Sequence, residues 1–357
     1  MKRLSIIVPI YNVEPYVERC IRSLEDQDIP RDSYEIICIN DGSPDGSHDV
    51  VVKLQGEFSN IVLIDQENQG VSRARNNGMK VAAGQYLMMV DPDDYLKPRV
   101  LKERLDIMDR YQLEVGLMGY TILNEAGKEV YKYDPTHDSA NYMPGVDLLN
   151  KFWSEQSDEE ERDPHRSVSM FFRTEFLKAH GLNYLVNVPY LEDGELMARI
   201  MCLATRVTFM NGEVYMRTTR PGSATHSPLY YSEKGRNGFV KAAHNLHAFK
   251  LEHCKSRAQV NFINDSIVHF TIMAITSLEI KHYMRHFSTL HRALKKGPLK
   301  KLDTEGCSRW YRKMGRYYNC SMHCFYLYWI WYRIREFIKI EIEYASWKRK
   351  QRKAAAA

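Results

Sequence analysis

The sequence predicts an α/β protein: a mostly parallel central sheet with helices on both faces, followed by a C-terminal helical subdomain. Two observations in the first 95 residues favour the parallel sheet. The apolar runs are continuous rather than alternating, and stretches with helical spacing of apolar residues separate them. A third observation, the helical pattern from Tyr230 onward, indicates the added subdomain.

The expected elements follow this alternation along the chain. In the first part we expect strands and helices in turn, at residues 4–10, 14–24, 34–40, 47–54, 61–64, 71–83 and 86–90. The pattern after residue 96 is more mixed. It predicts a helix at 97–111, extended segments over 115–133 with a hairpin at Asn124-Glu125-Ala126-Gly127, and a charged exposed loop at 154–166. A strand at 168–172, a helix at 193–203, and a strand or hairpin around Asn211-Gly212 over 207–217 are expected to follow.

These elements divide the chain into two regions and a short tail. Residues 1–227 are expected to form an α/β domain of two halves, 1–100 and 101–227, with ligands bound beyond the carboxyl ends of its parallel strands. Residues 228–353 are expected to form a helical, basic and aromatic region. Residues 354–357 are a tail from which we infer nothing.

The composition is that of a folded protein in a reducing compartment. With 357 residues, of which 44% are hydrophobic and 27% charged, the chain can hold one large α/β domain and an appendage. The seven cysteines lack paired metal-ligand spacing, which favours buried thiols over a zinc site. The start, Met1-Lys2-Arg3-Leu4, enters a strand without a signal-peptide pattern, so we expect a cytoplasmic location.

The charge is distributed unevenly along the chain. The net charge is +5, but from Lys281 onward there are 19 Lys or Arg against 5 Asp or Glu. An acidic body therefore carries a basic tail. The tail's aromatic residues match no recognisable RNA-binding motif, so no nucleic-acid partner is expected.

Three aspartates stand together where the strand at 86–90 ends, in the run Asp91-Pro92-Asp93-Asp94. Crowded carboxylates repel one another, and a hard divalent cation such as Mg²⁺ or Mn²⁺, bridging to phosphate, relieves that repulsion. The alternative is a solvated Asp-Pro-Asp turn, which is common after strands. Ligands of open parallel sheets bind beyond the carboxyl ends of the strands, where this run is expected to meet the loops at 9–13 and 40–46.

Two further loops carry candidate binding residues. In the run from Asn40 to Ser47, an acidic side chain can accept a hydrogen bond from a base or ribose, and the glycines allow close backbone approach. An Asx-turn that caps the next helix is the structural alternative. In the run from Asn68 to Gly78, helix N-terminal amides with Arg73 and Arg75 can hold anions, or the arginines can pair with the nearby aspartates.

The order and spacing of these motifs resemble the family 2 glycosyltransferases of the GT-A fold. The resemblance covers most of the first 100 residues and extends to Leu191-Glu192-Asp193, which is similar to the family's Glu-Asp motif. It rests on the runs Val8-Pro9-Ile10-Tyr11-Asn12, Asn40-Asp41-Gly42-Ser43, Asn68-Gln69-Gly70 with Ala74-Arg75-Asn76, and Asp91-Pro92-Asp93-Asp94. A segment with Arg217, Gly222, Ser223 and His226 is similar to a later element that closes over the diphosphate.

The resemblance implies a role for each matching position. Asp193 would be the general base, with Glu192 beside it, and Asp41 would contact the base of the nucleotide. The metal would be held by Asp93, Asp91 and His226. The nucleotide-sugar site would comprise Pro9, Tyr11, Asn12, Asp41, Gly70, Arg75, Asp91 and Arg217. This chain has Asn40 where the family more often has a first aspartate.

The implied function is an inverting glycosyltransferase that depends on Mn²⁺ or Mg²⁺. The donor would be a nucleotide-diphosphate sugar, UDP being the commonest, and the acceptor a hydroxyl of a saccharide or lipid-linked molecule in bacterial surface-polysaccharide biosynthesis. One carboxylate base placed for in-line attack gives a single displacement that inverts the anomeric centre. Two alternatives remain: a non-catalytic module that binds nucleotide sugars or anionic polymers, and a nucleotidylyltransferase, which would need a Gly-rich loop where this chain has Ile10-Tyr11-Asn12.

The tail contains an aromatic stretch at residues 317–332 without Lys, Arg, Asp or Glu. It is shorter than the roughly 20 residues that a spanning helix needs. Flanked by basic residues, it suits a helix in the headgroup region of an anionic membrane, which would place the protein at the inner face of the cell membrane. The alternative is a helix docked on the catalytic domain with its aromatic side chains in the core.

Overall fold

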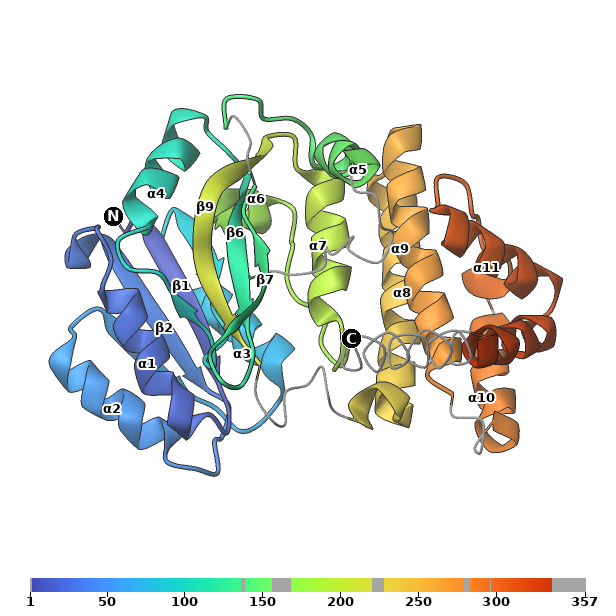
Figure 1. Ribbon diagram of the computed structural model, residues 1–357, viewed down its shortest axis with the longest axis horizontal. Coiled ribbons are helices and arrows are strands. Elements are labelled where there is room, and N and C mark those ends of the chain that lie inside the picture. Colours follow the sequence, from blue (N-terminus) through green and yellow to red (C-terminus); the bar gives the residue numbers. More distant parts are fainter. Residues whose placement is uncertain are drawn as a thin grey trace, which may run out of the picture.

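The computed structural model describes residues 2–135, 139–155, 168–219, 228–278, 283–295 and 297–335. Its centre is a nine-stranded mixed sheet (Figure 1). The strand order is β3 (Ile61–Asp65), β2 (Tyr34–Asn40), β1 (Leu4–Ile10), β4 (Tyr86–Met89), β8 (Met170–Arg173), β6 (Val115–Leu123), β9 (Val207–Thr218) and β5 (Tyr95–Leu96), with β7 (Glu129–Tyr133) paired to β6.

The sheet is parallel where the sequence predicts it. Strands β3, β2, β1 and β4 are all parallel neighbours, and their carboxyl ends therefore lie at one edge. Antiparallel pairs begin at β8, which joins β4 to β6, and the predicted hairpin at residues 124–127 connects β6 to β7. Strand β9 is one strand with a bulge, not a hairpin, because Gly212 takes a φ of +90° and the chain continues alongside β6.

Both faces of the sheet are covered by helices. One face holds α1 (Glu14–Glu25), α2 (Ser47–Glu57) and α4 (Leu101–Arg110), and its core includes Ile6 and Val8. The other holds α3 (Val71–Val81), α6 (Thr174–Ala179) and α7 (Glu192–Leu203), and its core includes Ile7. Because both faces are covered, β1, β2 and β4 are buried along their whole length, and the predicted α/β fold is confirmed.

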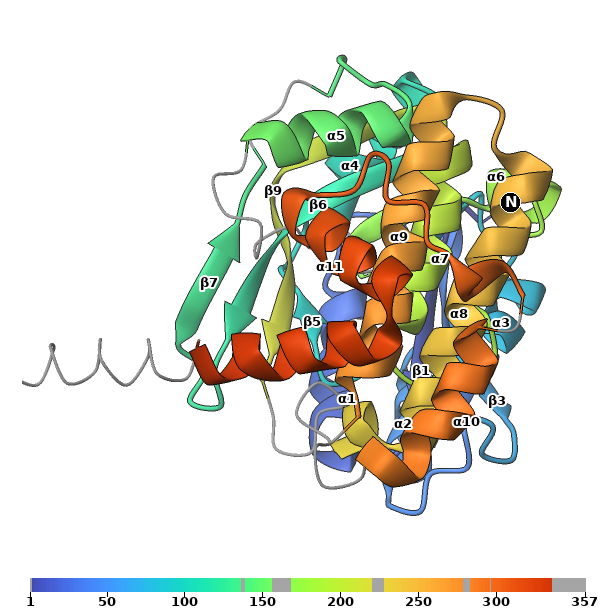
Figure 2. The same ribbon diagram turned by 90° about the vertical axis from the view of Figure 1, so that its right-hand side faces the viewer.

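The C-terminal region continues the second core instead of forming a detached body. Helices α8 (Glu233–His253) and α9 (Arg257–Thr276) pack on each other and on α7, and their buried residues belong to the same cluster as Ile7. Helices α5 (Gly145–Glu155), α10 (Tyr283–Lys295) and α11 (Arg309–Cys320) surround them (Figure 2). Residues 322–335 form a last helix, and no helix among the described residues is long and apolar enough to cross a membrane.

Helix α4 begins later than predicted because Lys97 follows the edge strand β5, where its N–H bonds to the Val214 carbonyl.

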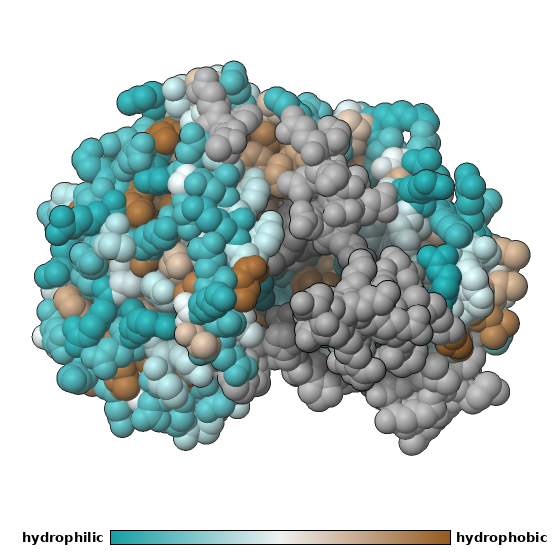
Figure 3. Space-filling view, in the orientation of Figure 1, coloured by the Kyte–Doolittle hydropathy of each residue, from teal (hydrophilic) through white to brown (hydrophobic). Residues whose placement is uncertain are grey.

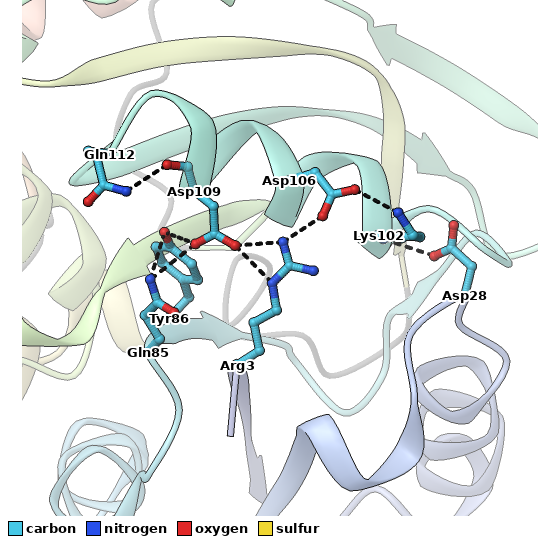
Figure 4. Close-up of polar contacts among 8 residues, drawn as sticks. All are labelled: Arg3, Asp28, Gln85, Tyr86, Lys102, Asp106, Asp109 and Gln112. Carbon is cyan, nitrogen blue, oxygen red and sulfur yellow. Dashed lines mark hydrogen bonds and ion pairs between the residues drawn. The ribbon is translucent and has the colours of Figure 1, made fainter. Parts of the chain in front are cut away.

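An ion-pair network fixes α4 to the amino end of the sheet (Figure 4). Arg3 donates to Asp106 at 2.6 Å and to Asp109 at 2.7 Å, and Asp109 also accepts from the hydroxyl of Tyr86 at 2.8 Å. The network lies at the end of β1 remote from its carboxyl edge.

The surface over α1 and α2 is mainly hydrophilic, with apolar residues scattered singly (Figure 3). Isolated apolar residues of this kind are normal for a protein surface and indicate no partner.

Candidate active site

Three acidic side chains from distant parts of the chain meet around one arginine. Arg75 Nη2 donates to Asp91 Oδ1 at 2.8 Å, and its Nη1 donates to Glu192 Oε1 at 2.9 Å and to Asp193 Oδ1 at 3.1 Å. Asp91 follows β4, whereas Glu192 and Asp193 open α7. The aspartate loop and the Glu-Asp motif, predicted to act together, are therefore in contact through Arg75.

The packing of α3 fixes where Arg75 lies. Gly70, with a φ of +86°, turns the chain into α3, and Gly78 lets the helix approach the sheet, since a Cβ there would lie 2.6 Å from a methyl carbon of Ile7. The guanidinium is buried and lies over the ring of Tyr184, 5.1 Å from its centroid. Its Nε has no hydrogen-bond partner among the described residues.

The charges of this cluster are strongly coupled. Burial opposes the positive charge of Arg75, but Asp193, Asp91 and Glu192 outweigh it and raise the pKa of Arg75 well above its ordinary value. Burial and the neighbouring Asp193 raise the pKa of Glu192 to about 7, and Arg75 opposes this rise. At neutral pH, Glu192 therefore carries a proton for part of the time, whereas Arg75 stays charged.

The backbone at the start of α7 is strained. Leu191, directly before Glu192, has a φ of 58° and a ψ of 31°. This is the left-handed region of backbone conformation, which residues other than Gly, Asn and Asp rarely adopt. Both Glu192 and Asp193 lie in the first turn, where the helix dipole stabilises negative charge. This position after the N-cap residue Leu191 is compatible with a catalytic role for either acid.

A buried tyrosine that the sequence did not single out fixes the aspartate loop. The hydroxyl of Tyr215 accepts a hydrogen bond from the Asp91 N–H at 3.1 Å and donates to Asp94 Oδ2 at 2.7 Å. The Thr218 N–H donates to Asp94 Oδ1 at 2.7 Å. Burial, then Asp91 and Asp93, raises the pKa of Asp94 well above its ordinary value. Asp94 therefore holds the loop while Asp91 and Asp93 remain partly exposed.

Asp41 is built into the loop before α3. Its Oδ1 accepts from the Gln66 side chain at 2.7 Å and from the Gln69 N–H at 2.8 Å, and its Oδ2 accepts from the Gly70 N–H at 2.9 Å. The carboxylate is almost fully buried. It therefore orders the entry to α3, and a bond to a nucleobase would use the remaining lone pair on Oδ2.

The other predicted binding residues lie at the same edge of the sheet or outside the described residues. Pro9 is buried in β1, and Tyr11 and Asn12 follow it, with Tyr11 exposed and Asn12 at a φ of 52°. Arg217 lies in β9, one residue from Thr218, which contacts the aspartate loop. His226 lies outside the described residues.

No group of three or more His, Cys, Asp or Glu among the described residues could hold a metal ion by itself. Two partly exposed carboxylates, Asp91 and Asp93, nonetheless have the oxygen donors that Mg²⁺ and Mn²⁺ prefer. A metal bound through one or two carboxylates and substrate phosphates needs no third protein ligand. The residues therefore fit a metal that arrives with its substrate.

A mostly parallel sheet with acidic loops at its carboxyl edge and an antiparallel extension is the GT-A arrangement. Residues 5–159 match the sequence profile of the family described as "Glycosyl transferase family 2". This match bears out, for residues 5–159, the resemblance to the family 2 glycosyltransferases that was inferred from the motifs.

Similar proteins include known and uncharacterised bacterial glycosyltransferases. The chain is 29% identical over 232 residues to EpsJ of Bacillus subtilis, described as an uncharacterized glycosyltransferase, with 63% of each chain covered. It is 31% identical over 150 residues to a poly(ribitol-phosphate) beta-glucosyltransferase of Bacillus spizizenii, covering 42% of this chain and 23% of that one. The chain thus spans less than two thirds of these relatives.

Solved structures share the fold over almost the whole chain. Residues 1–349 of TarS from Staphylococcus aureus, in complex with UDP-GlcNAc, superpose with a TM-score of 0.65 at 20% identity, covering 91% of this chain and 89% of that one. A mannosyltransferase from Pyrobaculum calidifontis, in complex with GDP-Man and Mn²⁺, superposes with a TM-score of 0.50 at 14% identity, covering 90% and 84%.

Proposed function

We propose that this protein transfers a sugar from a nucleotide-diphosphate sugar, with UDP the first donor to test, to a hydroxyl of a saccharide or lipid-linked acceptor. The observation that carries the proposal is the contact of Asp91 with Glu192 and Asp193 through Arg75. Asp91, a carboxylate on the donor side, and Asp193, the candidate base, thus bind the same guanidinium group. The relatives, which include a poly(ribitol-phosphate) glucosyltransferase, support a surface-polymer acceptor.

In this mechanism, Asp193 deprotonates the acceptor hydroxyl as it attacks the anomeric carbon. A single base on the face opposite the leaving group gives one displacement and inversion. Arg75 holds the side chain of Asp193 in place through an ion pair of 3.1 Å. Burial and Asp193 raise the pKa of Glu192 to about 7, so Glu192 is the second candidate for the base, and only the family resemblance favours Asp193.

Asp93 and Asp91 would hold the metal, with His226 as a further candidate ligand. When bound, a divalent cation offsets the negative charge that develops on the departing diphosphate. Asp94 and Tyr215 contribute by fixing the loop from which these carboxylates extend. Tyr11, Asn12, Asp41 and Gly70 would border the nucleoside, and Arg217 would contact the diphosphate.

Replacing Asp93 by alanine should weaken Mn²⁺-dependent donor binding by about tenfold or more, because a hard cation loses a carboxylate ligand. Isothermal titration of UDP-sugar with and without Mn²⁺ measures this directly. The exposed Asp49 on α2 provides the matched control, Asp49→Ala. Unchanged Mn²⁺-dependent affinity in Asp93→Ala would remove Asp93 from the metal site.

Aromatic residues beside the acids favour a saccharide as the acceptor. Tyr190 lies two residues before Glu192, and its ring contacts Tyr230, with centroids 5.8 Å apart. Tyr230 in turn contacts Tyr231, with centroids 4.8 Å apart, and Tyr231 is 45% exposed. Burial raises the pKa of Tyr190, and the charges of Tyr231, Arg217 and Glu192 act on it as well. Exposed aromatic faces next to a base suit the apolar face of a sugar ring.

The Tyr231→Ala variant should raise the KM for the acceptor by roughly two- to tenfold, the range expected when one aromatic contact is lost. Its donor binding and its slow hydrolysis of donor in water should not change. Tyr142, also exposed but on the approach to α5, supplies the control Tyr142→Ala. If acceptor KM is the same in all three proteins, Tyr231 does not contact the acceptor.

Turnover distinguishes this proposal from a binding module. The full chain, incubated with UDP-sugars, Mn²⁺ and saccharide acceptors, should release UDP in step with a new glycosidic bond. A binding module would retain the nucleotide sugar without releasing the diphosphate. A lipid-linked acceptor would bring the enzyme to the inner face of the cell membrane.

A further inference from the structure

The last described helix, residues 322–335, has one face packed on the protein. Met322, Phe325 and Tyr326 are buried, and they belong to the core that reaches the central sheet. The helix leads off at an angle from the end of α11 (Figure 2), and the rings of Tyr317 and Tyr328 stack with centroids 4.3 Å apart. The sequence left two alternatives for this stretch, a helix in the membrane headgroup region and a helix docked on the catalytic domain. The buried face of the helix is docked on the protein.

The opposite face of the same helix is apolar and open. Leu327, Trp331 and Ile334 are 67%, 52% and 53% exposed. Their spacing of four and three residues places them on one side of the helix, turned away from the buried face. Packing on the protein explains only one of the two opposed apolar faces of this helix. The second, exposed face therefore indicates a partner.

The charge around this face indicates an anionic partner. Residues 306–335 contain no Asp or Glu. The segment's basic side chains are all exposed: Arg309, Arg312, Lys313, Arg316, Arg333 and Arg335. Arg335 lies over the ring of Trp331 at 5.6 Å, and Lys313 over Tyr328 at 4.9 Å.

A lipid surface satisfies all three features of this face. Exposed Leu and Ile side chains favour the acyl region, Trp and Tyr favour the interface, and Lys and Arg favour anionic headgroups. A second copy of the chain would bring like charges together around the apolar stripe. Among the described residues, no helix has the length and apolarity that crossing a bilayer requires.

We propose that the face formed by Leu327, Trp331 and Ile334 lies on an anionic lipid bilayer, with the surrounding Arg and Lys side chains on lipid phosphates. One face of the helix then packs in the protein core, and the opposite face lies in the headgroup region of the bilayer. This surface does not depend on the proposed sugar transfer, so the two can fail separately. For a lipid-linked acceptor, it would keep the acidic site beside the membrane.

Vesicle flotation with the full chain tests this surface. The protein should float with phosphatidylcholine vesicles that contain about one-third phosphatidylglycerol, and much less with phosphatidylcholine alone. The triple variant Leu327→Gln, Trp331→Gln, Ile334→Gln should lower the partition coefficient by about tenfold or more, since three apolar side chains no longer enter the interface. Leu251→Gln, at a 73% exposed leucine of α8, is the matched control.

A second variant separates membrane contact from misfolding. Arg333→Glu with Arg335→Glu keeps the apolar stripe and should also lose binding to anionic vesicles, with an unchanged thermal unfolding midpoint. The proposal is overturned if the wild-type chain ignores anionic vesicles or if the triple variant binds them as tightly as Leu251→Gln. It is also overturned if gel filtration shows that the triple variant dissociates a dimer, because the face would then bind a second copy.

Discussion

Replacing Asp193 by asparagine is expected to abolish sugar transfer while donor binding stays almost unchanged. The substitution keeps the shape of the side chain but removes the charge that accepts the acceptor's proton. Loss of a general base typically lowers kcat by roughly 10²–10⁴-fold. UDP release with acceptor measures transfer, and calorimetry with UDP-sugar measures donor binding.

Glu192→Gln is the companion variant, because it changes the neighbouring acid by the same chemistry. If Asp193 is the base, Glu192→Gln should retain far more activity than Asp193→Asn. Were Glu192 the base, kcat/KM would rise with pH through an apparent pKa near 7, the value to which burial and Asp193 raise it. A profile with that midpoint, lost in Glu192→Gln, would transfer the role from Asp193 to Glu192.

The sequence predicts the local elements of this fold well because their signals are local. The continuous apolar run of β1 and the helical spacing of α1 each reflect burial against neighbours on both faces of the sheet. The pairing of the later strands is harder to predict from the sequence. β9 pairs in parallel with β6 although the paired residues Val115 and Val207 are 92 positions apart, and no local pattern specifies such a partner.

The acidic residues of the site were predictable, but the residues that position them were not. Asp91 and Asp193 belong to motifs that can be read along the chain. Tyr215, which fixes the aspartate loop, is 124 positions away from Asp91, and only the folded sheet brings its hydroxyl to that N–H. For Arg75 the sequence offered anion binding or pairing with aspartates, and the structure shows the pairing.

The prediction with the largest effect on stability concerns Arg75. In Arg75→Met, Asp91, Glu192 and Asp193 lose the cation that neutralises them, while their surroundings remain largely buried. Removing one partner of a buried ion pair costs about 3–5 kcal/mol of unfolding free energy. Chemical denaturation at pH 7 measures it. Arg73→Met, an exposed arginine on the same helix, should change the unfolding free energy by at most about 0.5 kcal/mol.

The deficit of Arg75→Met should depend on pH with a definite sign. Arg75 lowers the pKa of Glu192, so its removal raises that pKa further above the ordinary value of 4.5, beyond the value of about 7 in the native protein. A carboxyl with a raised folded-state pKa favours folding below its unfolded pKa and loses that contribution as pH rises through the folded pKa. Below about pH 7 Glu192 is mainly protonated in both folded proteins and adds nothing to the difference between them, so the deficit of the variant should grow as pH rises above 7. A deficit that stays constant as pH rises above 7 would show that Arg75 acts through packing on Tyr184, because packing does not titrate.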